Sequence, residues 1–129
     1  MYVLVVDDEV EIADLVVLLL RSQGVEARRV CNGEDALQVI SFTPVDLVIT
    51  DLMMPGVDGA EVVRRLRSIS NAPVVLMSAL SEAHALAACP PVDAFLQKPF
   101  TGARLRQAIT LASRNRSSRR AHDSDTAAA

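Results

Sequence analysis

Five short apolar runs alternate with segments of helical periodicity along most of the chain. The runs occupy residues 2–6, 25–30, 45–50, 73–77 and 94–96. Apolar residues at helical spacing follow each run, at residues 12–20, 35–42, 59–69, 82–88 and 104–112. Strands that alternate with helices form a parallel sheet with helices on both faces, and such strands are apolar throughout because both faces are buried. The alternation therefore predicts an α/β fold built from five βα units.

The length of the chain, 129 residues, suits one domain with a substantial core. Half of the residues are hydrophobic, but there is no Trp and only one Tyr and three Phe, so the core must be aliphatic. The segment after Ser113, RNRSSRRAHDSDTAAA, has no apolar periodicity. We therefore expect a domain over residues 1–113 and a disordered Arg/Ser-rich tail over residues 114–129.

Charge and cysteine usage exclude several classes of protein. The net charge is −3, and because the tail carries four Arg against two Asp, residues 1–113 are the more acidic part and a poor match for nucleic acid. No apolar run approaches the length of a membrane span, and the N-terminus enters the first strand without a charged leader. Cys31 and Cys89 are isolated, which favours neither a zinc site nor a disulfide framework. These features predict a cytoplasmic protein without a membrane partner.

Polar residues follow four of the five predicted strands. Asp7 and Asp8 follow the first strand, Asp51 the third, Ser78 the fourth and Lys98 the fifth. Because all strands of a parallel sheet end on the same edge, where ligands bind in folds of this class, these side chains are expected to converge.

Each of these residues also has an ordinary explanation. Asp8 and Glu11 have the spacing of a capping box, and Asp51 could open the turn at Pro55 and Gly56. A serine or a lysine that leaves a strand is usually a solvated surface residue. These separate explanations do not predict that three carboxylates, a hydroxyl and an ammonium meet at one edge.

The predicted cluster has a specific chemistry. Two carboxylates about 5 Å apart repel each other by roughly 3 kcal/mol at an effective dielectric constant of ~20, and a divalent cation removes this repulsion. Hard carboxylate ligands without His or Cys favour Mg²⁺. Lysine and hydroxyl groups suit phosphoryl oxygens, and a carboxylate can attack a phosphoryl group and hold it as an acyl phosphate. The pattern predicts that Asp51 accepts phosphate beside a Mg²⁺ site.

Four motifs carry a resemblance to a known family. They are VLVVDDE, DLVITDLMMPGVDG, VVLMSA and FLQKPF, and in this order the chain resembles the response-regulator receiver domain of bacterial two-component systems, a single receiver of the chemotaxis type, over residues 2 to 113. The resemblance implies a flavodoxin-like, doubly wound five-stranded parallel sheet of strand order 2-1-3-4-5. Such a domain is a phosphoacceptor in signalling and not an enzyme, although it assists its own phosphorylation and dephosphorylation.

The resemblance also implies a ligand set for Mg²⁺. Asp7 and Asp8 hold the ion, with Asp8 the more direct ligand. Asp51 and the backbone carbonyl of Met53 complete the protein ligands.

By the same resemblance, Asp51 takes its phosphoryl group from a histidine kinase or a phosphotransfer protein. Lys98 and Ser78 contact the phosphoryl group, and Phe95 falls at the switch aromatic of the family. Phosphorylation then changes the face formed by the fourth helix, fifth strand and fifth helix, to which a downstream protein or a second copy of the phosphorylated chain binds.

Two features depart from the usual pattern of the family. Ser78 replaces the commoner Thr, which keeps the hydroxyl. The stretch 81–92 is short and carries Pro90 and Pro91 where a Gly-Ala pair is usual, which affects the fourth helix.

Two alternatives to a phosphorylated receiver remain open from the sequence. A haloacid-dehalogenase-type phosphatase also uses Asp, Ser or Thr, Lys and Mg²⁺, but it needs a DxD motif where this chain has Asp7, Asp8 and Glu9, and it needs a cap domain. A degenerate receiver that only binds proteins would lack an acidic residue or the lysine. A flavodoxin-type electron carrier shares the fold, but its hydroxyl- and glycine-rich loop after the first strand is absent from this sequence. The chain is expected to be either a stand-alone receiver or a fragment of a longer regulator.

Overall fold

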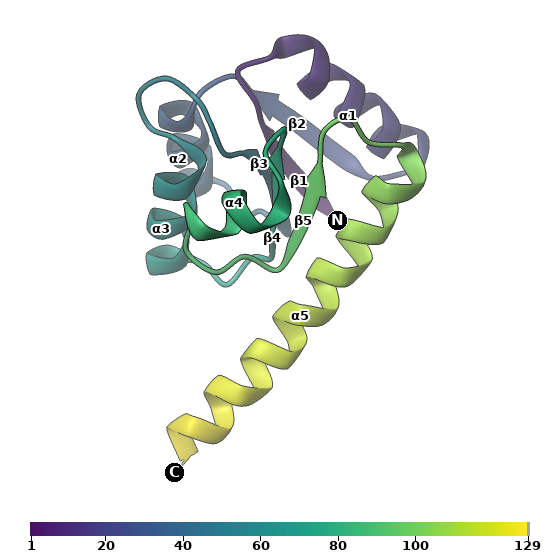
Figure 1. The fold of residues 1–129 in the computed structure, drawn as a ribbon. Helices are drawn as coiled ribbons and strands as arrows, with labels where there is room; N and C mark the ends of the chain where they lie inside the picture. Colours follow the sequence, from purple (N-terminus) through teal and green to yellow (C-terminus); the bar gives the residue numbers. More distant parts are fainter. Residues whose placement is uncertain (129) are drawn as a thin grey trace.

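The computed structural model describes the backbone of residues 1–128 and the side chains of residues 1–116. Five parallel strands form one sheet in the order β2-β1-β3-β4-β5 (Figure 1). The strands are β1 (Tyr2–Val6), β2 (Glu26–Val30), β3 (Leu47–Asp51), β4 (Val74–Ser78) and β5 (Ala94–Gln97). The helices are α1 (Val10–Ser22), α2 (Gly33–Phe42), α3 (Gly59–Ile69), α4 (Glu82–Ala87) and α5 (Gly102–Ala128). The predicted α/β class, parallel sheet and flavodoxin-like strand order are confirmed.

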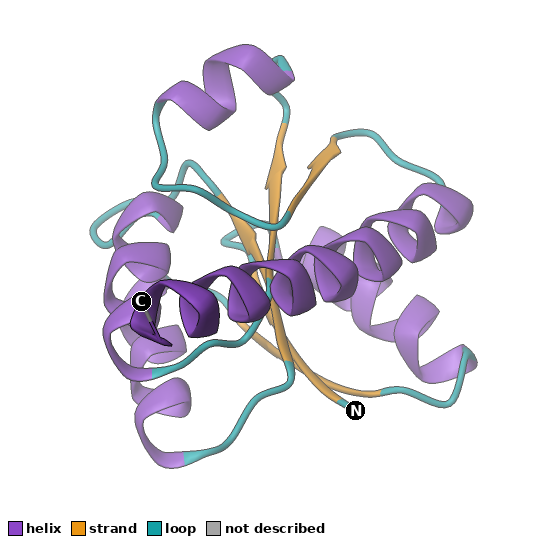
Figure 2. Ribbon diagram, turned by 90° about the horizontal axis from the view of Figure 1, so that it is seen from below, coloured by secondary structure: helices purple, strands orange, loops and turns teal. Residues whose placement is uncertain are grey.

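The sheet separates two apolar layers, because successive side chains of a strand point to opposite faces. Val3 and Val5 of β1 pack with α1 and α5, whereas Leu4 and Val6 pack with α2 and α3. A smaller cluster joins Ala85 of α4 to the same face as α2 and α3. Figure 2 shows the strands between helices on either side. Burial of both faces explains why the central strands are apolar throughout.

The last helix differs most from the sequence-based expectation. The prediction that it ends at residue 112 is wrong, since α5 spans 27 residues and its end extends away from the sheet (Figure 1). The amide of Asn115 donates to the backbone oxygen of Asp93 at 2.6 Å, so the helix contacts the body beyond the predicted boundary. The backbone of residues 114–128 is part of this helix. The side chains of residues 117–129 lie outside the described residues, and the division into a domain over 1–113 and a tail over 114–129 stays a prediction.

The apolar pattern stops at Ala112, which is why periodicity alone ended the helix there. Across residues 1–128, the structure contains no helix with the length and apolar character needed to cross a membrane.

Strand register brings the polar strand ends to one edge. Asp51 is the last residue of β3 and is paired with Met77, which precedes Ser78 at the end of β4. Asp7 follows β1 directly, and Lys98 follows β5 directly. The convergence expected from the parallel sheet is therefore present in the structure.

Candidate functional site

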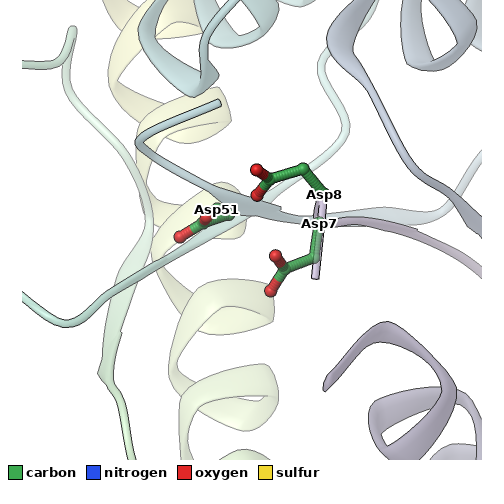
Figure 3. Close-up of side chains that lie close together, drawn as sticks. All are labelled: Asp7, Asp8 and Asp51. Atoms are coloured by element: carbon green, nitrogen blue, oxygen red, sulfur yellow. The ribbon is translucent and has the colours of Figure 1, made fainter. Parts of the chain in front are cut away.

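Three carboxylates meet at the end of β1 and β3 (Figure 3). Asp7, Asp8 and Asp51 each offer one oxygen, and these oxygens all lie within 4.8 Å of one another. Asp7 and Asp51 are buried, with 0% and 6% of their surface exposed, whereas Asp8 is exposed. The cluster therefore has two carboxylates shielded from water and one open to it.

Lys98 supplies the positive charge of this cluster. Its Nζ lies 2.8 Å from Oδ2 of Asp7 and 3.3 Å from Oδ1 of Asp51. A third carboxylate, Glu9, lies 3.5 Å from the same nitrogen. Only 9% of the lysine side chain is exposed, so it is not the solvated lysine of the ordinary explanation. Sequence reasoning did not single out Glu9, although it stands next to the acidic pair.

The start of α1 leaves the acidic pair available to the cluster. The residue that caps α1 is Glu9, and its side chain makes no capping hydrogen bond. The capping box suggested by Asp8 and Glu11 is therefore not formed. The amide of Glu9 instead donates to Oδ1 of Asp7 at 2.9 Å, which orients this carboxylate.

The pKa values of Asp7 and Asp51 are both raised, because these two carboxylates are buried together. Burial raises the pKa of Asp51 to about 6, and the charge of Asp7 adds to this effect while Lys98 opposes it. Burial also raises the pKa of Asp7, despite the hydrogen bond with Lys98. Burial by itself would lower the pKa of Lys98, but Asp7, Asp51 and Glu9 outweigh it, and the pKa is raised. The site thus holds more negative charge than one ammonium neutralises.

The donor set fits a hard divalent cation. Oδ2 of Asp7 is buried and contacts the ammonium of Lys98 at 2.8 Å, an ion pair that leaves the oxygen a further lone pair for a cation. Carboxylate oxygens without His or Cys are the ligands that Mg²⁺ prefers. Asp7, Asp8 and Asp51 are therefore suited to hold Mg²⁺.

The loop after Asp51 is residues 52–58, and we call it the acceptor loop. Leu52 is fixed on both sides, because its amide donates to Met77 and its carbonyl accepts from Gly59 at 2.8 Å. Gly59 is required here, since a Cβ atom would lie 2.1 Å from the backbone oxygen of Asp51. Met53 follows in the same loop with an exposed side chain.

Ser78 lies at the edge of the site, and Phe95 lies further along β5. The hydroxyl of Ser78 is buried and accepts a hydrogen bond from the amide of Leu80 at 3.1 Å. The carbonyl of Ser78 accepts from the amide of Lys98 at 2.8 Å. Phe95 is half-buried and lines a pocket of about 270 Å³ between α4 and α5. The short α4, only six residues, borders this pocket through Glu82.

Comparison with known proteins gives a consistent result. The sequence profile described as "Response regulator receiver domain" matches residues 3–110. The chain is 34% identical over 100 residues to the DNA-binding response regulator MtrA of Mycobacterium tuberculosis (strain ATCC 25618 / H37Rv), covering 76% of this chain and 44% of that protein. It is 42% identical over 77 residues to the sensory transduction protein RegX3 of Mycolicibacterium smegmatis, covering 60% and 34%. The chain thus spans less than half the length of these curated relatives.

Solved structures share the fold. The response regulator protein TrrA of Thermotoga maritima, solved in complex with Mg²⁺-BeF, has a TM-score of 0.74 and 33% identity over 84% of this chain and 96% of that chain. A response regulator receiver protein from Burkholderia phymatum has a TM-score of 0.73 and 36% identity over 87% and 94%.

Proposed function

This chain belongs to the response regulator receiver domain family, and from that premise we propose that Asp51 accepts a phosphoryl group from a phosphohistidine of a kinase or phosphotransfer protein. Receiver domains are signalling domains of two-component systems, and the resemblance based on the four motifs is confirmed. The observation that carries the proposal is the position of Asp51, buried between Asp7 and Lys98 at the ligand-binding edge.

The proposed metal site uses Asp7, Asp8, Asp51 and the backbone carbonyl of Met53. When bound there, Mg²⁺ neutralises the carboxylates and the charge on the oxygens of the transferred phosphoryl group. The raised pKa values of Asp7 and Asp51, which share the single ammonium of Lys98, support this assignment, because a cation offsets the remaining negative charge. The Mg²⁺-BeF complex of the related TrrA also supports it.

Phosphoryl transfer then needs mainly correct positioning. A carboxylate oxygen of Asp51 attacks phosphorus, and the bond from phosphorus to the histidine nitrogen breaks with its electron pair left on that nitrogen. The ammonium of Lys98 moves from Asp51 to a phosphoryl oxygen. This movement is short, because Nζ already lies 3.3 Å from Oδ1 of Asp51. The hydroxyl of Ser78 donates to another phosphoryl oxygen. In this proposal the domain assists its own phosphorylation and dephosphorylation but turns over no separate substrate.

The switch follows from the present partners of Ser78. Movement of its hydroxyl toward the phosphoryl group breaks the hydrogen bond from Leu80 and changes the loop that leads into α4. Phe95 then turns inward beside β4, and the face of α4, β5 and α5 changes shape. This face binds a downstream protein or a second phosphorylated copy, and we place the protein in the cytoplasm with the kinase.

Intact mass spectrometry tests the acceptor. The protein is incubated with a small phosphodonor, with and without Mg²⁺, and a gain of about 80 Da, the phosphoryl mass, is expected only with Mg²⁺. Asp51→Asn should gain no adduct. Asp14→Asn is the matched control, because Asp14 is an exposed aspartate of α1 that pairs with Arg29 of β2, and this variant should behave as the parent does. An undiminished adduct in Asp51→Asn would reject the assignment.

A further inference from the structure

The acceptor loop contacts the first turn of α2. The backbone amide of Val57 donates to Oε1 of Glu34 at 3.2 Å. Glu34 and Val57 are far apart in sequence, so this hydrogen bond joins two separate βα units at the edge that carries Asp51.

Two glycines allow this close approach, one from each side. A Cβ atom on Gly33 would lie 2.3 Å from the backbone oxygen of Val57. A Cβ atom on Gly56 would lie 2.7 Å from Oε1 of Glu34, and Gly56 has a φ of +74°. The backbone of Val57 leaves no room for a side chain on Gly33, and the positive φ of Gly56 favours glycine there, so the start of α2 fits closely against the loop.

The side chain of Glu34 is not needed to begin its own helix. The amide of Asp35 is capped by Oδ1 of Asn32 at 2.7 Å, which is the usual role of an N-cap residue. Glu34 is also outside the carboxylate cluster, which among the described residues consists of Asp7, Asp8 and Asp51. Its contact with the loop therefore explains its orientation better than capping or direct metal binding.

The acceptor loop is thus supported at two places. Its first residue, Leu52, is held by the carbonyl of Met77 in β4 and by the amide of Gly59, the first residue of α3. Toward its end, Glu34 holds Val57. Met53 lies between these supports. Mg²⁺ requires nearly ideal octahedral geometry, so a backbone carbonyl can serve as a ligand only if its loop is held in place.

We propose that Glu34 is a positioning residue for the metal site: its carboxylate holds the acceptor loop so that the carbonyl of Met53 is directed at the bound cation. This inference rests on the proposed function, in which that carbonyl is a ligand. Glu34 acts through the loop and touches neither the cation nor the phosphoryl group.

Calorimetric titration of the metal-free full chain with MgCl₂ tests the role of Glu34. The proteins compared are the parent, Glu34→Gln and Glu34→Ala. Both variants lose the same negative charge, so any long-range electrostatic effect on the cation is common to them. Only Gln keeps a side-chain oxygen that can accept from Val57. Circular dichroism verifies that both variants are folded.

The inference predicts that Glu34→Ala raises the Mg²⁺ dissociation constant about tenfold relative to Glu34→Gln, the lower end of what loss of a ligand-orienting group causes. Equal dissociation constants in the two variants would overturn it, because charge alone would then explain the effect. If the parent binds Mg²⁺ and Glu34→Ala binds it with the same dissociation constant, this inference alone is overturned. A parent that binds no Mg²⁺ would overturn the proposed metal site as well.

Discussion

The ammonium of Lys98 lies 2.8 Å from Oδ2 of Asp7, in a contact almost closed to solvent. Asp7 is fully buried and its other oxygen accepts from the amide of Glu9. Among the described residues, Lys98 is therefore the counterion that compensates the buried charge of Asp7. This relationship makes the lysine important for stability as well as for phosphate contact.

Removal of Lys98 should destabilise the metal-free protein. Lys98→Met leaves the carboxylate of Asp7 buried without a cation, and breaking a buried pair in this way costs about 3 kcal/mol. The free energy of unfolding is measured by urea denaturation in the presence of EDTA. Arg29→Met is the control, since its ion pair with Asp14 is exposed and should contribute little to stability. Equal losses in the two variants would contradict this role of Lys98.

Magnesium should stabilise the folded protein, because it relieves repulsion among Asp7, Asp8 and Asp51. At a concentration ten times the dissociation constant, the gain in free energy of unfolding is about 1.4 kcal/mol. Asp8→Asn should abolish most of this gain and, in EDTA, should be at least as stable as the parent. The measurement is thermal unfolding with and without MgCl₂. An unchanged melting temperature of the parent on addition of MgCl₂ would count against the proposed Mg²⁺ site.

Stability without metal should depend on pH through Asp51. Its pKa in the folded protein is about 6, above the ordinary 3.8, so the folded state binds this proton more tightly than the unfolded state. The corresponding stability is present at low pH and is lost as the pH rises from about 4 to about 6, up to about 3 kcal/mol in total. Asp51→Asn lacks this loss. Urea denaturation in EDTA should show that the free energy of unfolding of Asp51→Asn rises relative to that of the parent across this pH range. Above about pH 7 the difference between the two free energies should be constant. A difference that is constant from pH 4 to 7 would be the contrary result.

Phosphorylation should move Phe95 through Ser78. The vacated space beside β4 favours the inward rotamer of the ring, and the coupling amounts to about 1–3 kcal/mol. Fluorine NMR of fluorophenylalanine-labelled protein, with and without beryllofluoride, reports on the ring. The exposed Phe42 is an internal control whose signal should stay unchanged. If the Phe95 signal does not shift, or shifts equally in Ser78→Ala, the ring is a core residue and not a switch.

The sequence by itself determined the order and type of the elements. Burial on both faces makes a strand apolar throughout, and burial on one face gives a helix a regular apolar spacing. These two patterns predicted β1 and α3 with their observed ends. Because all parallel strands end on one edge, it also indicated that Asp51 and Lys98 would converge. These inferences need only the chain direction and the pattern of neighbouring residues.

Only the tertiary structure decided which side chains touch. The contacts of Lys98 with Glu9 and of Glu34 with Val57 join residues far apart in sequence, and neither follows from a local period. The length of α5 beyond Ala112 was likewise hidden, because the sequence after Ala112 carries no apolar period that would indicate a helix. The spacing of apolar residues indicates which positions of one helix or strand are buried. Contact between elements depends on register, close backbone approach and side-chain rotamers, which exist only once the chain has folded.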